Sequence, residues 1–213
     1  MISSTRSITT LLFDWDGTLV DSAQLGLLAF QKTFQALGIA FQQEVYEANY
    51  SPNWYLIYEA MALPRDQWPM ADELWVRHYD EESASPVEGA QETILELHRK
   101  GYRLGIVSSG NHRRVLREVN ELGLQTTFQA VVCHEQTTHK KPHPEGLETA
   151  MRMLRSSSAA CSYIGDSPED IQMGRTAQVL TVGVRSAYPS SKHLRNTQPD
   201  LYLESITELL AHF

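Results

Sequence analysis

Short apolar runs and helical patterns alternate along the C-terminal two thirds of the chain. Four apolar runs have the length and composition of β-strands: Arg103 to Val107, Gln129 to Cys133, Cys161 to Gly165 and Val179 to Val184. Apolar residues at helical spacing predict four helices: about Asn111 to Leu122, one from about Pro144, one from about Pro168, and a final one lined by Ile206, Leu209 and Leu210. This alternation predicts an α/β fold, in which a parallel sheet carries helices on both faces.

The segment from Ser22 to Ala84 follows the first apolar run, Leu11 to Phe13, and has a different pattern. It holds no convincing strand but three helical patterns: one marked by Leu25, Leu28 and Ala29, and the stretches Trp54 to Met61 and Ala71 to His78. A helical block at this place is typical of an insertion into a sheet scaffold, with Glu82 to Pro86 as the expected return linker. We therefore expect a core domain of residues 1–20 and 85–213 and a small helical domain of residues 21–84.

Composition and charge exclude several classes of protein. The chain has 213 residues, of which 42% are hydrophobic, and its formal net charge of −8 disfavours a broad nucleic-acid or acidic-membrane surface. No run of about 18 apolar residues occurs, and Met1 to Thr10 lacks the apolar centre of a signal peptide. The two cysteines, Cys133 and Cys161, are too few for a disulfide scaffold. These features predict a cytoplasmic protein without membrane or nucleic-acid partners.

Two carboxylates close the first strand. Asp14 and Asp16 are separated by one residue, and Gly17 directly after them permits a tight turn. At the two-residue period of a strand, their side chains share one face unless the backbone turns there. Two carboxylates about 4 Å apart repel each other by about 1–4 kcal/mol, so that a divalent cation or a lysine would stabilise them. The alternative is an acidic turn that caps the following helix.

A second pair of carboxylates follows the strand Cys161 to Gly165. Asp166 stands at the strand end, and Asp170 lies one helical turn later. Carboxylate oxygens together with water are the ligands that suit Mg²⁺. The alternative for this pair is capping of a helix N-terminus, which Ser167 and both aspartates would also serve.

Hydroxyl and ammonium groups complete the set of candidate residues. Ser108 and Ser109 follow a strand end, where hydroxyl and backbone N–H groups bind anions readily. Lys141 stands shortly before a predicted helix, and its ammonium is suited to neutralise an acidic site and bind phosphate. An ordinary helix cap and a solvated basic loop are the respective alternatives. Because ligands of a doubly wound sheet bind beyond the carboxyl ends of its strands, these residues are expected to converge with Asp14 and Asp166.

The four motifs together resemble those of the haloacid dehalogenase superfamily, specifically its phosphoglycolate-phosphatase-like hydrolases. The matching segments occur in the family's order: Asp14 to Ser22, Ser108, Lys141 to Pro144, and Gly165 to Asp170. The resemblance covers nearly the whole chain. It implies a Rossmann-like, doubly wound parallel sheet with strand order 3-2-1-4-5 and an inserted all-helical cap domain of the C1 type, residues 21–84.

Two positions depart from the family pattern. Ser109 stands where the family often has Asn after the hydroxyl of the second motif, which affects the expected phosphate contacts. Ala177 and Gln178 stand where the family usually closes the helix of the fourth motif with Ala-Gly. A left-handed helix end without Gly costs about 1 kcal/mol, which concerns stability rather than chemistry.

The resemblance also implies a role for each candidate residue. It implies a Mg²⁺-dependent phosphatase acting on a small-molecule phosphate monoester, in which Asp14 is the nucleophile that forms an aspartyl-phosphate and Asp16 is the general acid and base. Four residues would hold the Mg²⁺: Asp14, Asp16 through its backbone carbonyl, Asp166 and Asp170. The phosphate would be bound by Ser108, Ser109 and Lys141.

Two other functions stay open at this point. A sugar phosphomutase of the same superfamily, similar to β-phosphoglucomutase, would also keep the carboxylate of Asp16. A phosphoacceptor signalling module that does not turn over also uses an aspartate, Mg²⁺ and a lysine. The helical insertion would have no explanation in such a module.

Substrate choice is expected to lie in the helical cap. Asn53, Tyr55 and Arg77 are the candidates for substrate specificity, together with Trp54 and Tyr58, and core packing explains the aromatic ones at least as well. The expected ligand is a small phosphorylated metabolite, and the expected assembly is a monomer or a homodimer formed through the cap. The histidines show no metal-binding spacing, and we expect them to be mostly solvated.

Overall fold

A six-stranded parallel sheet forms the centre of the computed structural model, which describes residues 7–213. The strand order is β5-β4-β1-β6-β7-β8, and all neighbours pair in parallel. The strands have these bounds: β1 Thr10–Phe13, β4 Arg103–Val107, β5 Phe128–Val132, β6 Cys161–Gly165, β7 Leu180–Val184 and β8 Leu201–Leu203. The predicted order 3-2-1-4-5 is confirmed, and β8 adds a sixth strand beyond it. Most of the N-terminal stretch in which no signal peptide was expected, Met1 to Arg6, lies outside the described residues.

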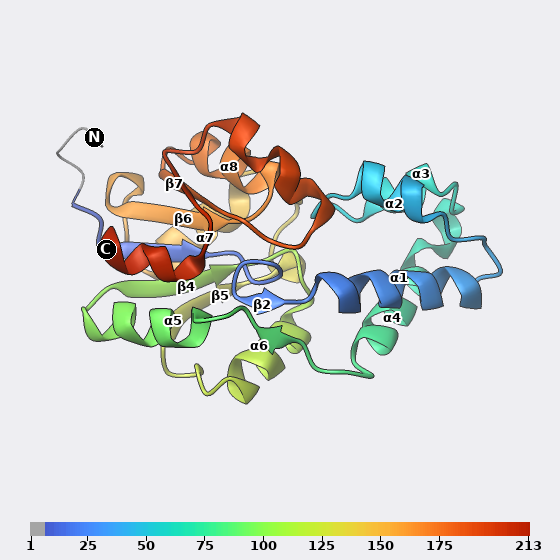
Figure 1. Cartoon of the computed structure of the whole chain (residues 1–213), viewed down its shortest axis with the longest axis horizontal. Helices are drawn as coiled ribbons and strands as arrows, with labels where there is room; N and C mark the ends of the chain where they lie inside the picture. The colour runs from blue at the N-terminus through green and yellow to red at the C-terminus, as the bar shows by residue number, and fades with distance from the viewer. Residues whose placement is uncertain (1–6) are drawn as a thin grey trace.

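Helices cover both faces of the sheet, as the alternating pattern predicts (Figure 1). Two hydrophobic clusters separate these faces because successive strand residues point to opposite sides: Leu11 and Phe13 pack in one cluster and Leu12 in the other. The first cluster includes residues of α5 (Ala90–Arg99), α6 (His112–Glu121) and the 3-10 helix η5 (Ile206–Ala211). The second includes residues of α7 (Glu145–Met153) and α8 (Pro168–Thr176).

The predicted elements of the core match the structure closely, but the final helix differs in type and several elements were not predicted, among them the 3-10 helix η4 (Pro189–Thr197). The final helix is a 3-10 helix, in which residues three apart share a face, and this buries Ile206 and Leu209 together. Helix α5 and strand β8 were not predicted. Gln178 adopts a left-handed conformation with φ of 60°, so this helix end does carry the strain that a Gly would relieve.

Between residues 22 and 84, the only regular elements of the described chain are helices. These helices are α1 Ala23–Ala36, α2 Gln43–Asn49, α3 Tyr55–Ala60, the short 3-10 helix η1 Arg65–Gln67 and α4 Trp68–Tyr79. Three of them correspond to the predicted patterns, and α2 was missed. They lie together beyond one edge of the sheet (Figure 1) and bury their own cluster, in which Phe30, Phe34 and Tyr58 are central. Two segments connect the core to this helical unit. They pair with each other as the short antiparallel strands β2 (Val20–Asp21) and β3 (Ser85–Pro86).

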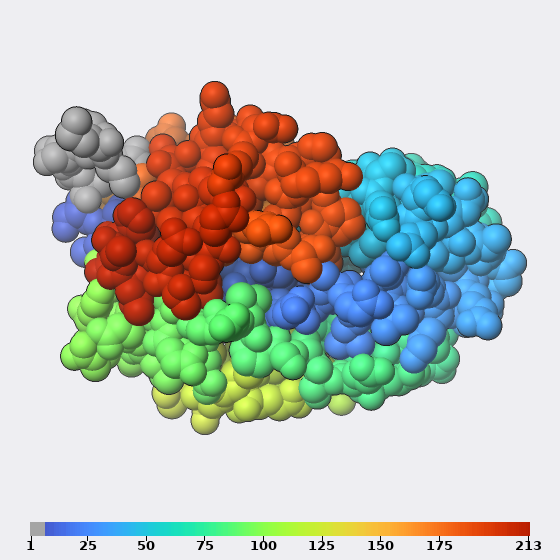
Figure 2. All heavy atoms as spheres, viewed as in Figure 1, coloured from blue at the N-terminus to red at the C-terminus, as the bar shows by residue number. Residues whose placement is uncertain are grey.

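The helical unit also touches the C-terminal half of the core. In Figure 2 its cyan and blue residues meet the orange ones of the C-terminal half. Tyr50 of the helical unit stacks on Tyr188, with 4.7 Å between the ring centroids. The Tyr188 hydroxyl and the Ser22 hydroxyl are hydrogen-bonded at 2.9 Å. The helical unit thus forms one wall of a space above the sheet edge. Among residues 7–213, no helix combines the length and the apolar character needed to cross a membrane.

Candidate active site

Three buried carboxylates gather at the carboxyl ends of β1 and β6. Asp14 directly follows β1 and Asp166 directly follows β6, and the two strands are neighbours in the sheet. Asp170 lies in the first turn of α8, which begins right after β6. Oxygen atoms of these three residues lie within 4.8 Å of one another, and each residue is at most 5% exposed. Adjacent parallel strands therefore bring together groups that lie about 150 positions apart in the sequence.

One lysine is bound between two of these carboxylates. The Nζ atom of Lys141 lies 2.8 Å from Oδ1 of Asp14 and 2.8 Å from Oδ1 of Asp170. Burial alone would lower the pKa of Lys141, but the two carboxylates raise it above its ordinary value. The ammonium is therefore charged at neutral pH and supplies a single positive charge to three carboxylates.

The three carboxylates of the cluster outnumber its one cation, Lys141. Burial raises the pKa of Asp14 to about 7, with Lys141 opposing the rise and Asp170 adding to it. Burial also raises the pKa of Asp166, and the charges of Asp14 and Asp170 raise it further. The side-chain hydrogen bonds to Asp166 come from neutral groups, the hydroxyls of Ser186 at 2.5 Å and Thr18 at 3.4 Å. When all three carboxylates are ionised, Lys141 leaves two negative charges uncompensated, which fits one divalent cation bound by oxygen ligands.

Asp170 is less suited to bind a cation than the other two aspartates. Its Oδ1 atom accepts hydrogen bonds from Lys141 and from the Tyr163 hydroxyl. Its Oδ2 atom accepts from the backbone N–H and the hydroxyl of Ser167, and this contact caps α8. All four bonds would compete with metal binding. Asp14 and Asp166 therefore have more oxygen lone pairs free for a cation than Asp170, one of whose oxygens accepts a hydrogen bond from Lys141.

The carboxylate of Asp16 is not part of this cluster. The chain turns after β1, with Gly17 at φ of 82° and a bridge between Asp16 and Val20. The Asp16 carboxylate accepts two hydrogen bonds from the Arg114 guanidinium, at 2.6 and 3.0 Å, and one from the Ser22 hydroxyl at 2.8 Å. Burial would raise the pKa of Asp16, but the guanidinium overcomes this and lowers it. Asp16 is thus held ionised in this conformation.

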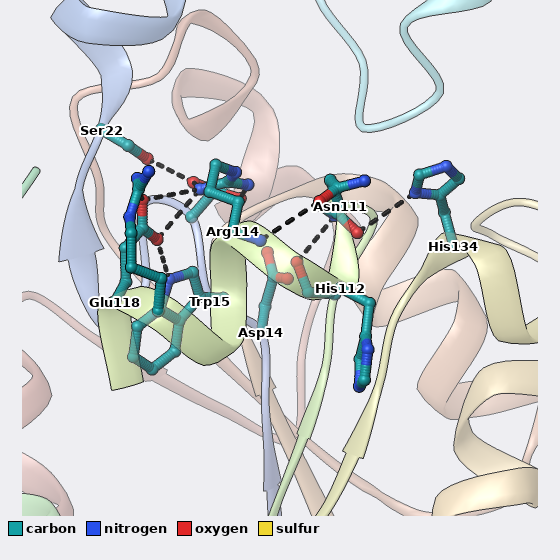
Figure 3. Close-up of polar contacts among 12 residues, drawn as sticks. Asp14, Trp15, Ser22, Asn111, His112, Arg114, Glu118 and His134 are labelled. Atoms are coloured by element: carbon teal, nitrogen blue, oxygen red, sulfur yellow. Dashed lines mark hydrogen bonds and ion pairs between the residues drawn. The ribbon is translucent and has the colours of Figure 1, made fainter. Parts of the chain in front are cut away.

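Arg114 is a buried residue of α6 that the sequence analysis did not single out (Figure 3). Its guanidinium also donates to Glu118, 3.0 Å away, and Glu118 accepts a hydrogen bond from Trp15 Nε1 at 2.6 Å. On the side of the helical unit, the guanidinium lies over the Tyr79 ring, 4.5 Å from its centroid. Arg114 and Glu118 stand four residues apart on a predicted helix, a spacing that favours an ion pair and was the available signal. No local sequence pattern indicated the pairing of Arg114 with Asp16, which lies 98 positions away in the chain.

Comparison with known proteins shows the family of this chain. A sequence profile of the haloacid dehalogenase-like hydrolases matches residues 11–184. The chain belongs to this family. The hydrolase is 34% identical over 211 residues to the pyrophosphatase PpaX of Listeria monocytogenes serotype 4b, with 97% of each chain covered.

Two solved structures share the fold of the hydrolase along almost its whole length. One is named as a predicted phosphoglycolate phosphatase from Haemophilus somnus 129pt; it has a TM-score of 0.86 and 17% identity, with 98% of this chain and 99% of the other covered. The other is a β-phosphoglucomutase from Clostridium difficile, with a TM-score of 0.78 and 20% identity, covering 95% and 93%. At these identities the likeness shows the fold alone.

A cavity of about 570 Å³ lies between the carboxylates of the hydrolase and its helical unit. On the core side it is lined by Asp14, Asp16, Asp166 and the predicted phosphate-binding residues Ser108 and Ser109. The Ser108 hydroxyl accepts a hydrogen bond from the Gly110 N–H at 2.9 Å, which fixes its position at the end of β4. The strand ends thus present carboxylates and hydroxyls to one cavity.

The predicted specificity residues do not all line this cavity. Arg77, Trp54 and Tyr58 are among the lining residues, whereas Asn53 and Tyr55 are not. The Tyr55 ring packs between Trp54 and Trp68, with centroids 5.2 and 4.6 Å away, as expected for an aromatic residue of a hydrophobic core.

Two histidines also come together, contrary to the interpretation that they have no metal-binding spacing. His139, His143 and Glu145 each offer a ligand atom within 4.8 Å of the others, and both histidines are exposed. The two rings stack on each other, and Glu145 is hydrogen-bonded to His139. The H-x-x-x-H spacing in the sequence was the signal that could have found this pair.

Gly17 allows the hydrolase to close the turn against Asp166, and its replacement by Ala is expected to damage both stability and activity. A Cβ atom there would lie 2.5 Å from Asp166 Oδ2 and 2.6 Å from Tyr188 Cδ2, in addition to the strain at positive φ. We expect Gly17→Ala to lower the free energy of unfolding by more than about 1 kcal/mol and the melting temperature by at least about 2–4 °C.

Gly38→Ala is the matched control, because Gly38 has φ of 71° but no atom within 4 Å of the added Cβ. This variant measures the backbone strain of a Cβ atom at positive φ without a steric clash with neighbouring atoms. Thermal unfolding of both variants tests this prediction, and equal losses of melting temperature would show that close packing against Asp166 has no effect.

Proposed function

We propose that this hydrolase is a Mg²⁺-dependent phosphatase that hydrolyses a small-molecule phosphate monoester through an aspartyl-phosphate on Asp14. The observation that carries the proposal is the charge of the cluster: three buried carboxylates gather around one ammonium, and two of them, Asp14 and Asp166, line a cavity. An anionic substrate can approach such a site only when a cation compensates the carboxylates. The names of the relatives, a pyrophosphatase and a phosphoglycolate phosphatase, support phosphate chemistry.

The first half of the proposed reaction transfers the phosphoryl group to the protein. An oxygen of Asp14 forms a bond to phosphorus while the ester P–O bond breaks, and Asp16 donates a proton to the leaving oxygen. Lys141 and Ser108 bind the non-reacting oxygens and stabilise the charge that they carry in the transition state. Mg²⁺, held by Asp14, Asp166 and the backbone carbonyl of Asp16, would supply further charge neutralisation at this place.

The second half releases phosphate. A water molecule attacks the phosphorus of the aspartyl-phosphate, the bond to Asp14 breaks, and Asp16 takes the proton from the water. The ionised state of Asp16, which Arg114 maintains, suits this second step. Donation of a proton in the first step requires that the contact to Arg114 loosens. Since Arg114 lies against Tyr79 of the helical unit, movement of that unit would change the contact.

We further propose that residues 21–84 act as a cap domain on a core formed by residues 1–20 and 85–213. The helices of this segment have their own hydrophobic cluster, and the β2–β3 pair, the stacking of Tyr50 on Tyr188 and the contact of Arg114 with Tyr79 join them to the core. A cap that opens and closes would admit substrate and then exclude water from the aspartyl-phosphate. The buried free cysteines Cys133 and Cys161 fit the reducing environment of the cytoplasm, where we place the enzyme.

Phosphate release from a panel of phosphorylated metabolites tests the proposed function. We expect turnover with Mg²⁺ and a loss of at least about 10²-fold when EDTA removes the metal, because the uncompensated carboxylates then repel the substrate. The same panel run for bisphosphate-dependent isomerisation distinguishes a phosphomutase, which conserves phosphate. Phosphate release that is unaffected by EDTA, or isomerisation without release, would contradict the proposal.

A further inference from the structure

The core and the helical unit meet at a lysine that the proposed reaction does not use. Lys140 directly precedes Lys141 in the loop before α7, so it belongs to the core. We propose that Lys140 is a positioning residue of the phosphatase, whose ammonium holds the indole ring of Trp54 in place as a wall of the cavity. The inference rests on the proposed phosphatase function, and one of its tests requires no activity.

The ammonium of Lys140 lies against two aromatic rings of the helical unit. Its Nζ atom is 3.5 Å from the centroid of the Trp54 ring and 4.5 Å from that of Tyr55. Both residues stand at the start of α3. The two distances fall within the roughly 6 Å over which the face of an aromatic ring attracts a cation. Within residues 7–213 no ion pair joins this ammonium to a carboxylate, so the rings are its contact partners.

The environment of Lys140 strengthens this attraction. The side chain is half-buried, and burial lowers the pKa of Lys140 to about 8, with the charges of Asp72 and Glu135 opposing the fall. At pH 7 the ammonium is therefore charged in most molecules, although it has lost part of its hydration. The attraction between a cation and an aromatic ring increases when water is removed from the cation.

The two rings are also held from within the helical unit. Asp72 of α4 accepts hydrogen bonds from Trp54 Nε1 at 2.6 Å and from the Tyr55 hydroxyl at 3.3 Å. A ring that donates a hydrogen bond to a carboxylate becomes richer in electrons, so its face attracts a cation more strongly. Trp54 is thus bound at its edge by a carboxylate of the helical unit and at its face by an ammonium of the core.

This contact bears on the substrate through Trp54. Trp54 lines the cavity together with Asp14 and Ser108, whereas Lys140 does not. Loss of the ammonium would leave the Trp54 wall in place in only a fraction of the molecules, and substrate affinity would fall by that fraction. The reacting carboxylates would stay where they are. We therefore expect Lys140 to affect KM and to leave kcat almost unchanged.

Kinetics of three variants at pH 7, with Mg²⁺ and 4-nitrophenyl phosphate, test the positioning role. Lys140→Met keeps most of the alkyl chain without the charge, and we expect it to raise KM by about three- to tenfold with kcat within about twofold of wild type. Lys140→Arg keeps a cation over the rings and should bring KM back to within about twofold. Lys100→Met is the matched control at an exposed lysine at the end of α5, and it should leave both constants unchanged.

A double-mutant cycle on melting temperature tests the pairing without any assay of activity. It compares wild type, Lys140→Met, Trp54→Leu and the double variant. Because the attraction exists only while both partners are present, Trp54→Leu should lower the melting temperature by at least about 2 °C more in wild type than in the Lys140→Met background.

The outcomes separate the two proposals. Absence of phosphate release by wild type from every substrate would overturn the phosphatase function and, with it, the positioning role. With release intact, an unchanged KM in Lys140→Met, or a raised KM that Lys140→Arg does not restore, would overturn the positioning role alone. Changes of melting temperature that add within about 1 °C would show that Lys140 and Trp54 do not interact, which also overturns the inference.

Discussion

Asp14→Asn is expected to abolish turnover, with kcat lowered by at least about 10⁴-fold, because an amide cannot form the aspartyl-phosphate. The same substitution is expected to stabilise the metal-free protein. Asp14 is buried beside Asp170 and Asp166, and burial raises its pKa from 3.8 to about 7. Ionisation of Asp14 thus opposes folding, and the neutral amide removes this opposition.

The sign of the pH dependence follows from that pKa. Below about pH 4 Asp14 is protonated in both the folded and the unfolded protein, and it does not affect the pH dependence. As pH rises from 4 to 7 the unfolded chain releases this proton and the folded protein retains it, so the free energy of unfolding falls, by roughly 3 to 4 kcal/mol from this group. We compare the melting temperatures of Asp14→Asn and wild type, both in EDTA. The value for Asp14→Asn minus the value for wild type should be larger at pH 8 than at pH 5.

Differential scanning fluorimetry at both pH values, together with a phosphate-release assay, measures the two effects. Asp66→Asn is the matched control, because Asp66 is an exposed residue of η1. Addition of Mg²⁺ should raise the melting temperature of wild type more than that of Asp14→Asn. Retained turnover in Asp14→Asn would rule out Asp14 as the nucleophile. A difference in melting temperature between the two proteins that does not depend on pH would contradict the raised pKa of Asp14.

Arg114→Met is expected to have the largest effect on stability. The change removes the guanidinium from the half-buried carboxylate of Asp16 and from the buried carboxylate of Glu118, which keeps only the more distant Arg117 at 3.7 Å. Removal of one partner of a buried ion pair costs about 3–5 kcal/mol, which lowers the melting temperature of a protein of this size by roughly 10 °C. Without the guanidinium, burial raises the pKa of Asp16, so the acid limb of the kcat profile should move to higher pH.

Two further variants keep this prediction testable. Arg114→Lys retains the charge but not the two parallel hydrogen bonds, and it should recover part of the stability while kcat stays about ten- to a hundredfold below wild type. Arg113→Met changes the exposed neighbour on α6 and should alter the melting temperature by no more than about 2 °C. An unshifted pH profile in Arg114→Lys and Arg114→Met would show that Arg114 has a structural role only.

The structure also explains why Arg114 matters beyond its own contacts. Its guanidinium lies between the carboxylate of Asp16 on one side and the Tyr79 ring of the helical unit on the other. Trp15, which directly precedes Asp16, reaches the same network through Glu118. The movement of the helical unit that we propose would therefore change the contact that keeps Asp16 ionised.

Much of the fold was readable from local patterns. The strand bounds Arg103–Val107 and Cys161–Gly165 were predicted without error, because buried parallel strands are short apolar runs between polar segments. Helix α2 and the short strand β8 were missed, because their few buried residues give no clear period. The final helix was predicted as helical, and only its packing against the sheet decided that it is a 3-10 helix.

The sequence by itself determined where the chemistry lies. Asp14 and Asp166 each follow a strand, and parallel strands place their carboxyl ends at one edge, so their convergence follows from local pattern and sheet topology. The tertiary structure alone decided the partner of each charged group. Asp16 turned away from Asp14 toward Arg114, and aromatic and acidic side chains of the helical unit came to line the cavity. Strand position is encoded over a few neighbouring residues, whereas the partner of a buried charge depends on packing between segments far apart in the chain.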